Sequence, residues 1–463
     1  MSARVETDAD IRAMFAADSS GLRYLPSGVA RPRSAEEVSA ILREAADHRT
    51  GVTPAGMQTS TTGASITENG IVLSLRDLTP IIDIDSKARI ARASAGSILG
   101  EVKRAAAAEG FLLAPDPTSE EESSVGGAVA CNASGARTLK YGATREHVRA
   151  LTVVLASGDV VEFRRSGLEK NTAGYAFAHE PVDWFVGSEG TLGVVVAAEL
   201  ALLPLPERVI GLEIPFATEA QALAFVVAAR ESRSVSPRCL EYFDELAVGI
   251  ARNAENSRGA GDLHEQLVAA SGTMVYVEQE VAAANDAGLD SWLALAESQQ
   301  ALVDDVRVFD GEQALATARL TRHAVPSTMN ERGAGHREAG GRKVSTDWAV
   351  PYRRLHEAIS TARQLARDAG VAQAVTYGHA GNGHPHQNYV ARDANELHAI
   401  EQVVEATLRT VLSMGGTVSA EHGIGKLKRR WLPLQMSRLE LGVMRAVKNE
   451  LDPLGILAPG NIF

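Results

Sequence analysis

Residues 124–142 read SVGGAVACNASGARTLKYG, and their four glycines stand among small and hydroxylated residues. Two shorter pieces have the same character: PAGMQTSTTG at residues 54–63 and GSEGTLGV at residues 187–194. Glycine allows tight turns and a close approach of the backbone to a ligand. Small polar residues let backbone N–H groups converge on an anion. Turns and close packing explain each piece singly, but three of them among strand-like runs favour a nucleotide cofactor.

The surrounding sequence alternates apolar strand-like runs with amphipathic segments. No strand–GxGxxG–helix unit occurs, so the argument for a Rossmann-type dinucleotide fold is not available. A helix over residues 34–48 begins at Ser34, a good N-cap, with Glu37 three residues on. We expect further helices at residues 97–109, 217–232 and 288–302, and strands at residues 51–54, 70–75, 90–96, 151–155, 160–163, 209–214 and 273–278. The mixture predicts an α+β protein, with a domain boundary at residues 202–207.

Composition excludes several classes of protein. The 463 residues are enough for two domains, and 58 acidic against 46 basic side chains argue against a nucleic-acid or anionic-membrane partner. Two cysteines, Cys131 and Cys239, cannot hold an iron–sulfur cluster, which takes four thiolates. They also form no disulfide framework, which suits a reducing compartment. With no apolar signal core and no run of 18 apolar residues, we expect a cytoplasmic protein without a membrane span.

A second informative stretch, residues 377–388, reads YGHAGNGHPHQN, and Glu421-His422 follows later. Its glycines and Pro385 forbid a regular helix. Two imidazoles and a carboxylate suit a borderline divalent metal such as zinc, and three protein ligands would leave an open position for catalysis. Because strand residues two apart share a face, His384 could replace His386 as a ligand. The alternative interpretation is a surface loop that merely contains glycine and histidine.

Together these pieces resemble the vanillyl-alcohol-oxidase/PCMH flavoprotein superfamily, and most closely its D-lactate, D-2-hydroxyglutarate and glycolate dehydrogenase branch. The resemblance lies in residues 54–63, 115–119, 124–142 and 187–193, and it extends over nearly the whole chain. Met57 and Gln58 stand where glycines are usual. The resemblance implies that the following residues contact FAD: Pro54, Gly56, Gln58, Thr59, Ser60, Gly63, Pro117, Thr118, Gly126, Gly127, Asn132, Ser134, Gly135, Tyr141, Gly142, Glu189, Gly190, Gly193 and Val194.

The same resemblance implies a domain plan and an active site. It implies a PCMH-type FAD-binding domain at residues 1–206, a ferredoxin-like α+β cap domain at 207–420 with the metal-ligand loop, and a segment at 421–463 that returns to the FAD domain. Asn382 replaces a usual aspartate and His384 a usual asparagine. The implied roles are metal ligation by His379, His386 and Glu421, proton acceptance by His422, and substrate binding by Arg322, Lys343 and Asn388.

The expected function is an FAD-dependent dehydrogenase that oxidises a D-2-hydroxy acid to the 2-oxo acid. Non-covalent FAD would accept hydride, a divalent metal, with zinc as first expectation, would acidify the substrate hydroxyl, and a histidine would take its proton. The final electron acceptor, whether quinone, electron-transfer flavoprotein, cytochrome or oxygen, stays open, as does a homodimer. Two alternatives remain: another enzyme of the superfamily, similar to alkylglycerone-phosphate synthase, or a non-catalytic flavin-binding subunit of a larger oxidase complex.

Overall fold

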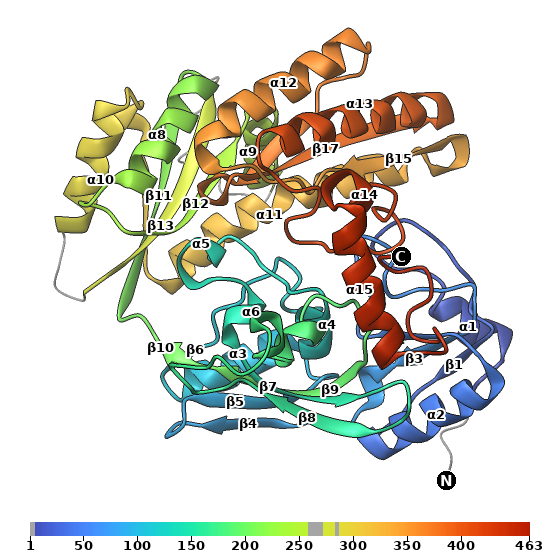
Figure 1. Ribbon diagram of the computed structural model, residues 1–463. Helices are drawn as coiled ribbons and strands as arrows, with labels where there is room; N and C mark the ends of the chain where they lie inside the picture. The colour runs from blue at the N-terminus through green and yellow to red at the C-terminus, as the bar shows by residue number, and fades with distance from the viewer. Residues whose placement is uncertain (1–4, 258–271, 283–286) are drawn as a thin grey trace. The chain divides into compact units, whose positions relative to one another are not determined.

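The structure is a computed structural model that describes residues 5–257, 272–282 and 287–463 (Figure 1). Its contacts divide the chain into two units. The first unit comprises Met1–Gly135, Gly142–Leu205 and Glu421–Phe463, and the second comprises Ala136–Tyr141 and Pro206–Ala420. The short piece Ala136–Tyr141, which belongs to the second unit although it lies inside a glycine-rich block, was not foreseen. Both units mix helices and sheets, which confirms the predicted α+β class.

A small parallel sheet in the first unit has the order β1-β3-β2, with β1 at Gly28–Ala30, β2 at Val52–Ala55 and β3 at Ile71–Ser74. Helix α2 (Ala35–His48) connects β1 to β2 and buries the apolar face that its sequence predicts. The returning segment joins the same sheet. The Val52 amide donates to the Ile456 carbonyl at 2.7 Å, and the Ala458 amide donates to the Val52 carbonyl at 2.7 Å.

The larger sheet of the first unit is antiparallel and has the order β4-β5-β9-β7-β8. Its core is formed by Val153, Val196, Leu200 and their buried neighbours, together with Val129 of α4. The strands are β4 (Ile82–Asp85), β5 (Ile90–Ser94), β7 (Val148–Val154), β8 (Val160–Arg164) and β9 (Val194–Ala201), with β6 (Phe111–Leu112) and β10 (Leu203–Pro204) forming a separate pair. The other helices are α1 (Ala9–Met14), α3 (Leu99–Ala108), α4 (Val125–Ala130), α6 (Thr144–His147), α7 (Val182–Phe185), α14 (Leu432–Gln435) and α15 (Arg438–Leu451).

The second unit contains a seven-stranded antiparallel sheet of order β14-β11-β13-β12-β16-β17-β15. Its strands are β11 (Arg208–Phe216), β12 (Pro237–Phe243), β13 (Thr273–Val281), β14 (Arg307–Asp310), β15 (Gly340–Ser345), β16 (Val375–His379) and β17 (His384–Asp393). Its helices are α5 (Thr138–Tyr141), α8 (Glu219–Glu231), α9 (Glu245–Ser257), α10 (Ala287–Ser298), α11 (Glu312–Ala334), α12 (Leu355–Asp368) and α13 (Ala394–Ser413).

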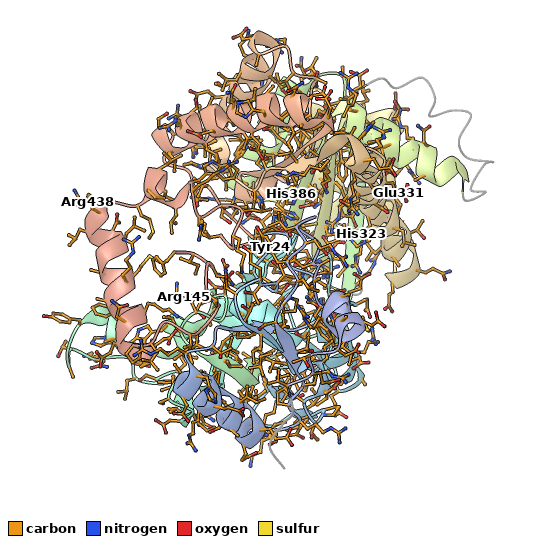
Figure 2. The ribbon with its side chains drawn as sticks, turned by 90° about the vertical axis from the view of Figure 1, so that its right-hand side faces the viewer. Tyr24, Arg145, His323, Glu331, His386 and Arg438 are labelled. Atoms are coloured by element: carbon orange, nitrogen blue, oxygen red, sulfur yellow. The ribbon has the colours of Figure 1, made fainter. Side chains whose placement is uncertain are left out.

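Helices cover both faces of this sheet. On one face, side chains of α9 and α11 share a buried cluster with Phe243, Tyr276 and Tyr377. On the other, α8 packs against β12 and β13 and α13 against β17, while α12 and α13 run side by side (Figure 1). Figure 2 labels His386 on β17 and His323 on α11, two elements that pack against each other. Residues that alternate along a strand share a face, so His384, His386 and Asn388 point to one side of β17. No helix in the described part of the chain is both long and apolar enough to cross a membrane.

Candidate functional site

In the first unit the three glycine-rich pieces pack against one another. A Cβ atom on Gly56 would lie 2.3 Å from Ser124 Oγ, and one on Gly190 would lie 3.0 Å from Pro54 Cγ. Both distances are shorter than a normal contact, so the loop after β2, the start of α4 and the turn before β9 approach closely only because these residues are glycines. Pieces far apart in the sequence thus form one backbone-lined region.

Three non-glycine residues of this region adopt left-handed backbone conformations: Gln58 (φ 58°), Asn132 (φ 49°) and Glu189 (φ 51°). The side chain of each one is fixed by a backbone group. Gln58 Nε2 donates to the Phe15 carbonyl at 3.1 Å, and Asn132 Oδ1 accepts from the Arg145 amide at 2.9 Å. Such strained residues cluster at ligand sites. All three are among the predicted FAD contacts, so their conformations support a functional role for this region.

Glu189, the third residue with a left-handed conformation, is hydrogen-bonded to the turn that follows His422. Its carboxylate accepts hydrogen bonds from the amides of Ile424 (2.5 Å) and Gly425 (2.7 Å). Burial raises the pKa of Glu189, while these two amides oppose the rise. Thr62 also contacts this turn, because its Oγ1 donates a hydrogen bond to the His422 carbonyl at 3.4 Å. Two of the three glycine-rich pieces therefore position the backbone of the proposed base.

The remaining predicted FAD contacts divide between the units. Tyr141 and its helix α5 belong to the second unit, where the Tyr141 hydroxyl bonds the Glu280 carboxylate. Ser134 Oγ donates to Glu421 Oε1 at 3.1 Å within the first unit. The other residues lie in the first unit: Pro54, Thr59, Ser60, Gly63, Pro117, Thr118, Gly126, Gly127, Gly135, Gly142, Gly193 and Val194. Contact of each residue with FAD stays a prediction.

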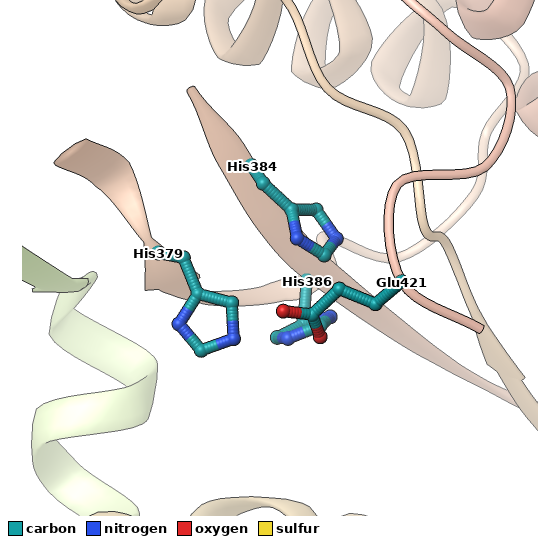
Figure 3. A group of neighbouring side chains, drawn as sticks. All are labelled: His379, His384, His386 and Glu421. Atoms are coloured by element: carbon teal, nitrogen blue, oxygen red, sulfur yellow. The ribbon is translucent and has the colours of Figure 1, made fainter. Parts of the chain in front are cut away.

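In the second unit, three histidines gather at the hairpin between β16 and β17. His379 pairs with His384 across the two strands, and Tyr377 pairs with His386. The ring centroids are 4.6 Å apart for His384 and His386, 5.2 Å for His379 and His386, and 5.5 Å for His379 and His384. His379 and His384 are buried, and His386 is half-buried. Figure 3 draws the three rings together with Glu421, the residue that follows the last residue of the second unit.

Buried carboxylates face two of these imidazoles. Glu241 Oε1 lies 2.7 Å from His379 Nδ1, and Asp347 Oδ1 lies 3.2 Å from His384 Nε2. Both carboxylates are almost fully buried, with 2% and 1% of their side-chain surface exposed. A histidine that binds a metal usually donates its other ring N–H to a carboxylate, a backbone carbonyl or water, which fixes its tautomer and orientation. Neither acid was predicted to have this role from the sequence; the available signal for Glu241 was a charge inside the apolar run CLEYF.

Glu241 also contacts the arginine predicted to bind substrate. Arg322 Nη1 on α11 lies 3.1 Å from Glu241 Oε2, so one carboxylate joins Arg322 to His379. Lys343 Nζ donates to Asn330 Oδ1 at 2.7 Å, and burial lowers the pKa of Lys343 to about 8. Asn388 is fully buried, and its Nδ2 donates to the Tyr377 hydroxyl at 2.9 Å. Substrate binding by these side chains stays a prediction.

The donor set of the second unit fits a divalent cation. Imidazole nitrogens are ligands that zinc, iron, nickel and copper accept. Three neutral imidazoles at these separations offer lone pairs to one ion, whereas three protonated ones would repel. Asn382, which stands where an aspartate is usual, contributes no carboxylate, but Glu241 and Asp347 supply two from other strands and loops. The residues present therefore suit a metal without the missing aspartate.

Comparison with known proteins assigns the family. Residues 26–164 match the FAD binding domain family, and residues 205–462 match the family described as FAD linked oxidases, C-terminal domain. The second match covers more than half of the chain. The chain belongs to the FAD-linked oxidases, and it is an oxidoreductase with an FAD-binding domain. These matches confirm the family resemblance that the sequence motifs indicate.

Several relatives resemble the chain over almost its full length. A D-lactate dehydrogenase of Archaeoglobus fulgidus is 32% identical, with 94% of this chain and 90% of the relative covered. A D-2-hydroxyglutarate dehydrogenase of Xanthomonas citri pv. viticola is 31% identical, with 95% and 89% covered. The glycolate oxidase subunit GlcD of Bacillus subtilis is 30% identical, with 95% and 89% covered.

Solved structures share the fold at lower sequence identity. A structure of alkyldihydroxyacetonephosphate synthase superposes with a TM-score of 0.74 and 18% identity, covering 98% of this chain and 82% of that one. A second crystal form gives a TM-score of 0.71 and 19% identity, with 95% and 78% covered. At this identity the likeness concerns the fold alone.

Proposed function

We propose that this protein is an FAD-dependent dehydrogenase that oxidises a D-2-hydroxy acid to the 2-oxo acid. The observation that carries the proposal is the histidine cluster at the β16–β17 hairpin, which the buried Glu241 joins to Arg322. Such a site can hold a metal and a carboxylate side by side, and a 2-hydroxy acid presents a hydroxyl next to a carboxylate. The names of the three relatives agree, since they specify D-lactate, D-2-hydroxyglutarate and glycolate.

The proposed metal ligands are His379, His386 and Glu421, with zinc as the first expectation and manganese or iron as alternatives. The metal would lower the pKa of a bound substrate hydroxyl. Support for Glu421 comes from the chain itself. Asp347, which faces His384, also accepts from Ser419 Oγ at 2.7 Å, and its carbonyl accepts from the Ala420 amide at 2.8 Å. Consecutive Cα atoms are about 3.8 Å apart. The Cα atom of Glu421 therefore lies one residue away from Ala420, whose amide is hydrogen-bonded to Asp347.

The other proposed roles follow from side-chain chemistry. His422, directly after Glu421, would accept the hydroxyl proton as a neutral imidazole. A guanidinium group can bond both oxygens of a carboxylate, so Arg322 would hold the acid, with Lys343 and Asn388 beside it. FAD, when bound, supplies the hydride acceptor. We propose that it is held without a covalent link by the glycine-lined region of the first unit.

The proposal is tested by anaerobic reduction of the flavin. Purified protein is mixed without oxygen with D-lactate, D-2-hydroxyglutarate, glycolate and the L forms of the two chiral acids. We expect at least one D acid to bleach the flavin absorption and its L form to fail. Protein that carries flavin and metal and stays yellow with every acid would overturn the proposal. Release of the colour by acid precipitation tests the non-covalent link, since a coloured pellet contradicts it.

A further inference from the structure

His384 has the placement of a metal ligand. It is the first residue of β17, it pairs with His379 across the hairpin, and it lies two residues before His386 on the same face. Its ring is nearer to that of His386 than either ring is to that of His379. At 3% exposure the imidazole cannot turn to solvent. Any cation bound between His379 and His386 therefore meets the third ring as well.

The surroundings of His384 resemble those of His379 in part, because a buried carboxylate lies close to one ring nitrogen of each. His379 Nδ1 shares a 2.7 Å hydrogen bond with Glu241 Oε1, whereas His384 Nε2 lies 3.2 Å from Asp347 Oδ1, a distance of an ion pair without hydrogen-bond geometry. Such a carboxylate directs the remaining ring nitrogen toward the metal. On this observation we propose that His384 is a third imidazole ligand of the divalent cation and that Asp347 is its positioning residue. The inference rests on the proposed metal site and enlarges its ligand set.

The main rival is a purely structural contact between His384 and Asp347 that has nothing to do with a metal. The two explanations differ in what a cation at the hairpin would touch, because the ring centre of His384 lies 4.6 Å from that of His386 and 5.5 Å from that of His379. Measurements of metal binding separate them.

A third imidazole raises the number of protein ligands that the metal would have. With Glu421, the protein would supply four ligands, which fills a tetrahedral zinc site. A substrate that binds the same ion through its oxygen atoms would raise the number of ligands further. Manganese and iron commonly take six ligands, whereas zinc in proteins more often takes four or five. The enlarged ligand set would therefore suit manganese or iron better than the three-ligand set does.

The experiment compares metal binding by the full flavin-containing chain and its variants. Zinc and manganese dissociation constants are measured by competition with a chelator for wild type, His384→Asn, His379→Asn and Asp347→Asn, with His398→Asn on exposed α13 as the control. We expect affinity to fall at least about 10–100-fold for both ligand variants. Asp347→Asn should lose about tenfold, and His398→Asn should match wild type. Flavin content and thermal unfolding show whether each variant is folded.

A spectroscopic measurement separates ligation from mere structure. Cobalt is loaded into wild type, His384→Asn and Asp347→Asn, and the visible cobalt bands are recorded as difference spectra. We expect the bands to change in His384→Asn and to keep their shape in Asp347→Asn, which retains the ligands. Wild-type affinity and an unchanged cobalt spectrum in His384→Asn, while His379→Asn loses the metal, would overturn this inference and leave the proposed function intact. A wild type that binds no metal would overturn both.

Discussion

The two units place their candidate functional residues in different ways. In the first unit, function rests on the backbone: Gly56 and Gly190 permit close approach, and Gln58 and Glu189 hold left-handed conformations. In the second unit it rests on buried charge, where Glu241 joins His379 to Arg322. The difference predicts that substitutions at the glycines of the first unit change packing and flavin content. Substitutions at Glu241, His379 or Arg322 in the second unit are predicted to change metal or substrate affinity.

The largest effect is expected at His422. The backbone at and just after this residue is held by Thr62 and Glu189 of the first unit, but the proposed role of its side chain is to accept a proton. His422→Ala should lower the rate of anaerobic flavin reduction by about 10²–10⁴-fold, the usual scale for a positioned acid–base group. Bound metal and FAD should stay at wild-type levels, measured by elemental analysis and absorbance. Loss of metal together with activity would make His422 a ligand instead of a base.

A substitution of Arg322 tests the role of buried charge in the second unit. Arg322→Ala should lower kcat/KM about 30-fold or more, because losing a partly buried charge pair costs about 2–5 kcal/mol. Arg319→Ala is the matched control. It lies one turn earlier on α11, with about a third of its side chain exposed, and it bonds Glu278 instead of Glu241. Equal losses in both variants would mean that the general charge of α11, and not Arg322 itself, holds the acid.

A substitution of Gly190 tests whether the close packing of the glycine-rich pieces in the first unit is needed. Gly190→Ala should destabilise the protein by about 1–3 kcal/mol more than Gly174→Ala, because a Cβ at 190 overpacks against Pro54. Both glycines have positive φ, 73° and 85°, but a Cβ on Gly174 meets nothing within 4 Å. Urea unfolding and flavin per chain measure the difference. Equal stability and equal flavin would show that the close approach is not needed.

The smallest expected effect is a change of kcat/KM with pH that depends on Lys343. Its amine is charged below a pKa of about 8 and neutral above it, because burial disfavours the charged form. If Lys343 binds the substrate carboxylate, kcat/KM should fall about fivefold between pH 8 and pH 9 as the amine loses its proton. Lys343→Arg keeps its charge over this range and should remove that fall. A decline that persists in Lys343→Arg belongs to another group.

Local signals made part of this structure predictable. Glycine-rich pieces and histidine spacing are visible in short windows, and the α+β class followed from alternating periodicities. By contrast, Glu241 and Asp347 reach the histidines through strand pairing and loop placement, which no window of sequence contains. Helix α11 was also missed. It continues through Pro326, a residue that normally ends a helix, because packing of Val325 and Met329 into the core outweighs the local cost.

The returning segment has a consequence for the order of synthesis. Ile456 and Ala458 complete the sheet that holds β2, and Glu189 finds the amides of Ile424 and Gly425 only after these residues exist. On a ribosome that adds about 5–20 residues per second, the intervening second unit takes about 10–40 s to emerge. The main part of the second unit, Pro206–Ala420, is therefore complete before the last segment of the first unit, Glu421–Phe463, has been made. Until then β2 lacks its hydrogen bonds to Ile456 and Ala458, and Glu189 lacks those from Ile424 and Gly425.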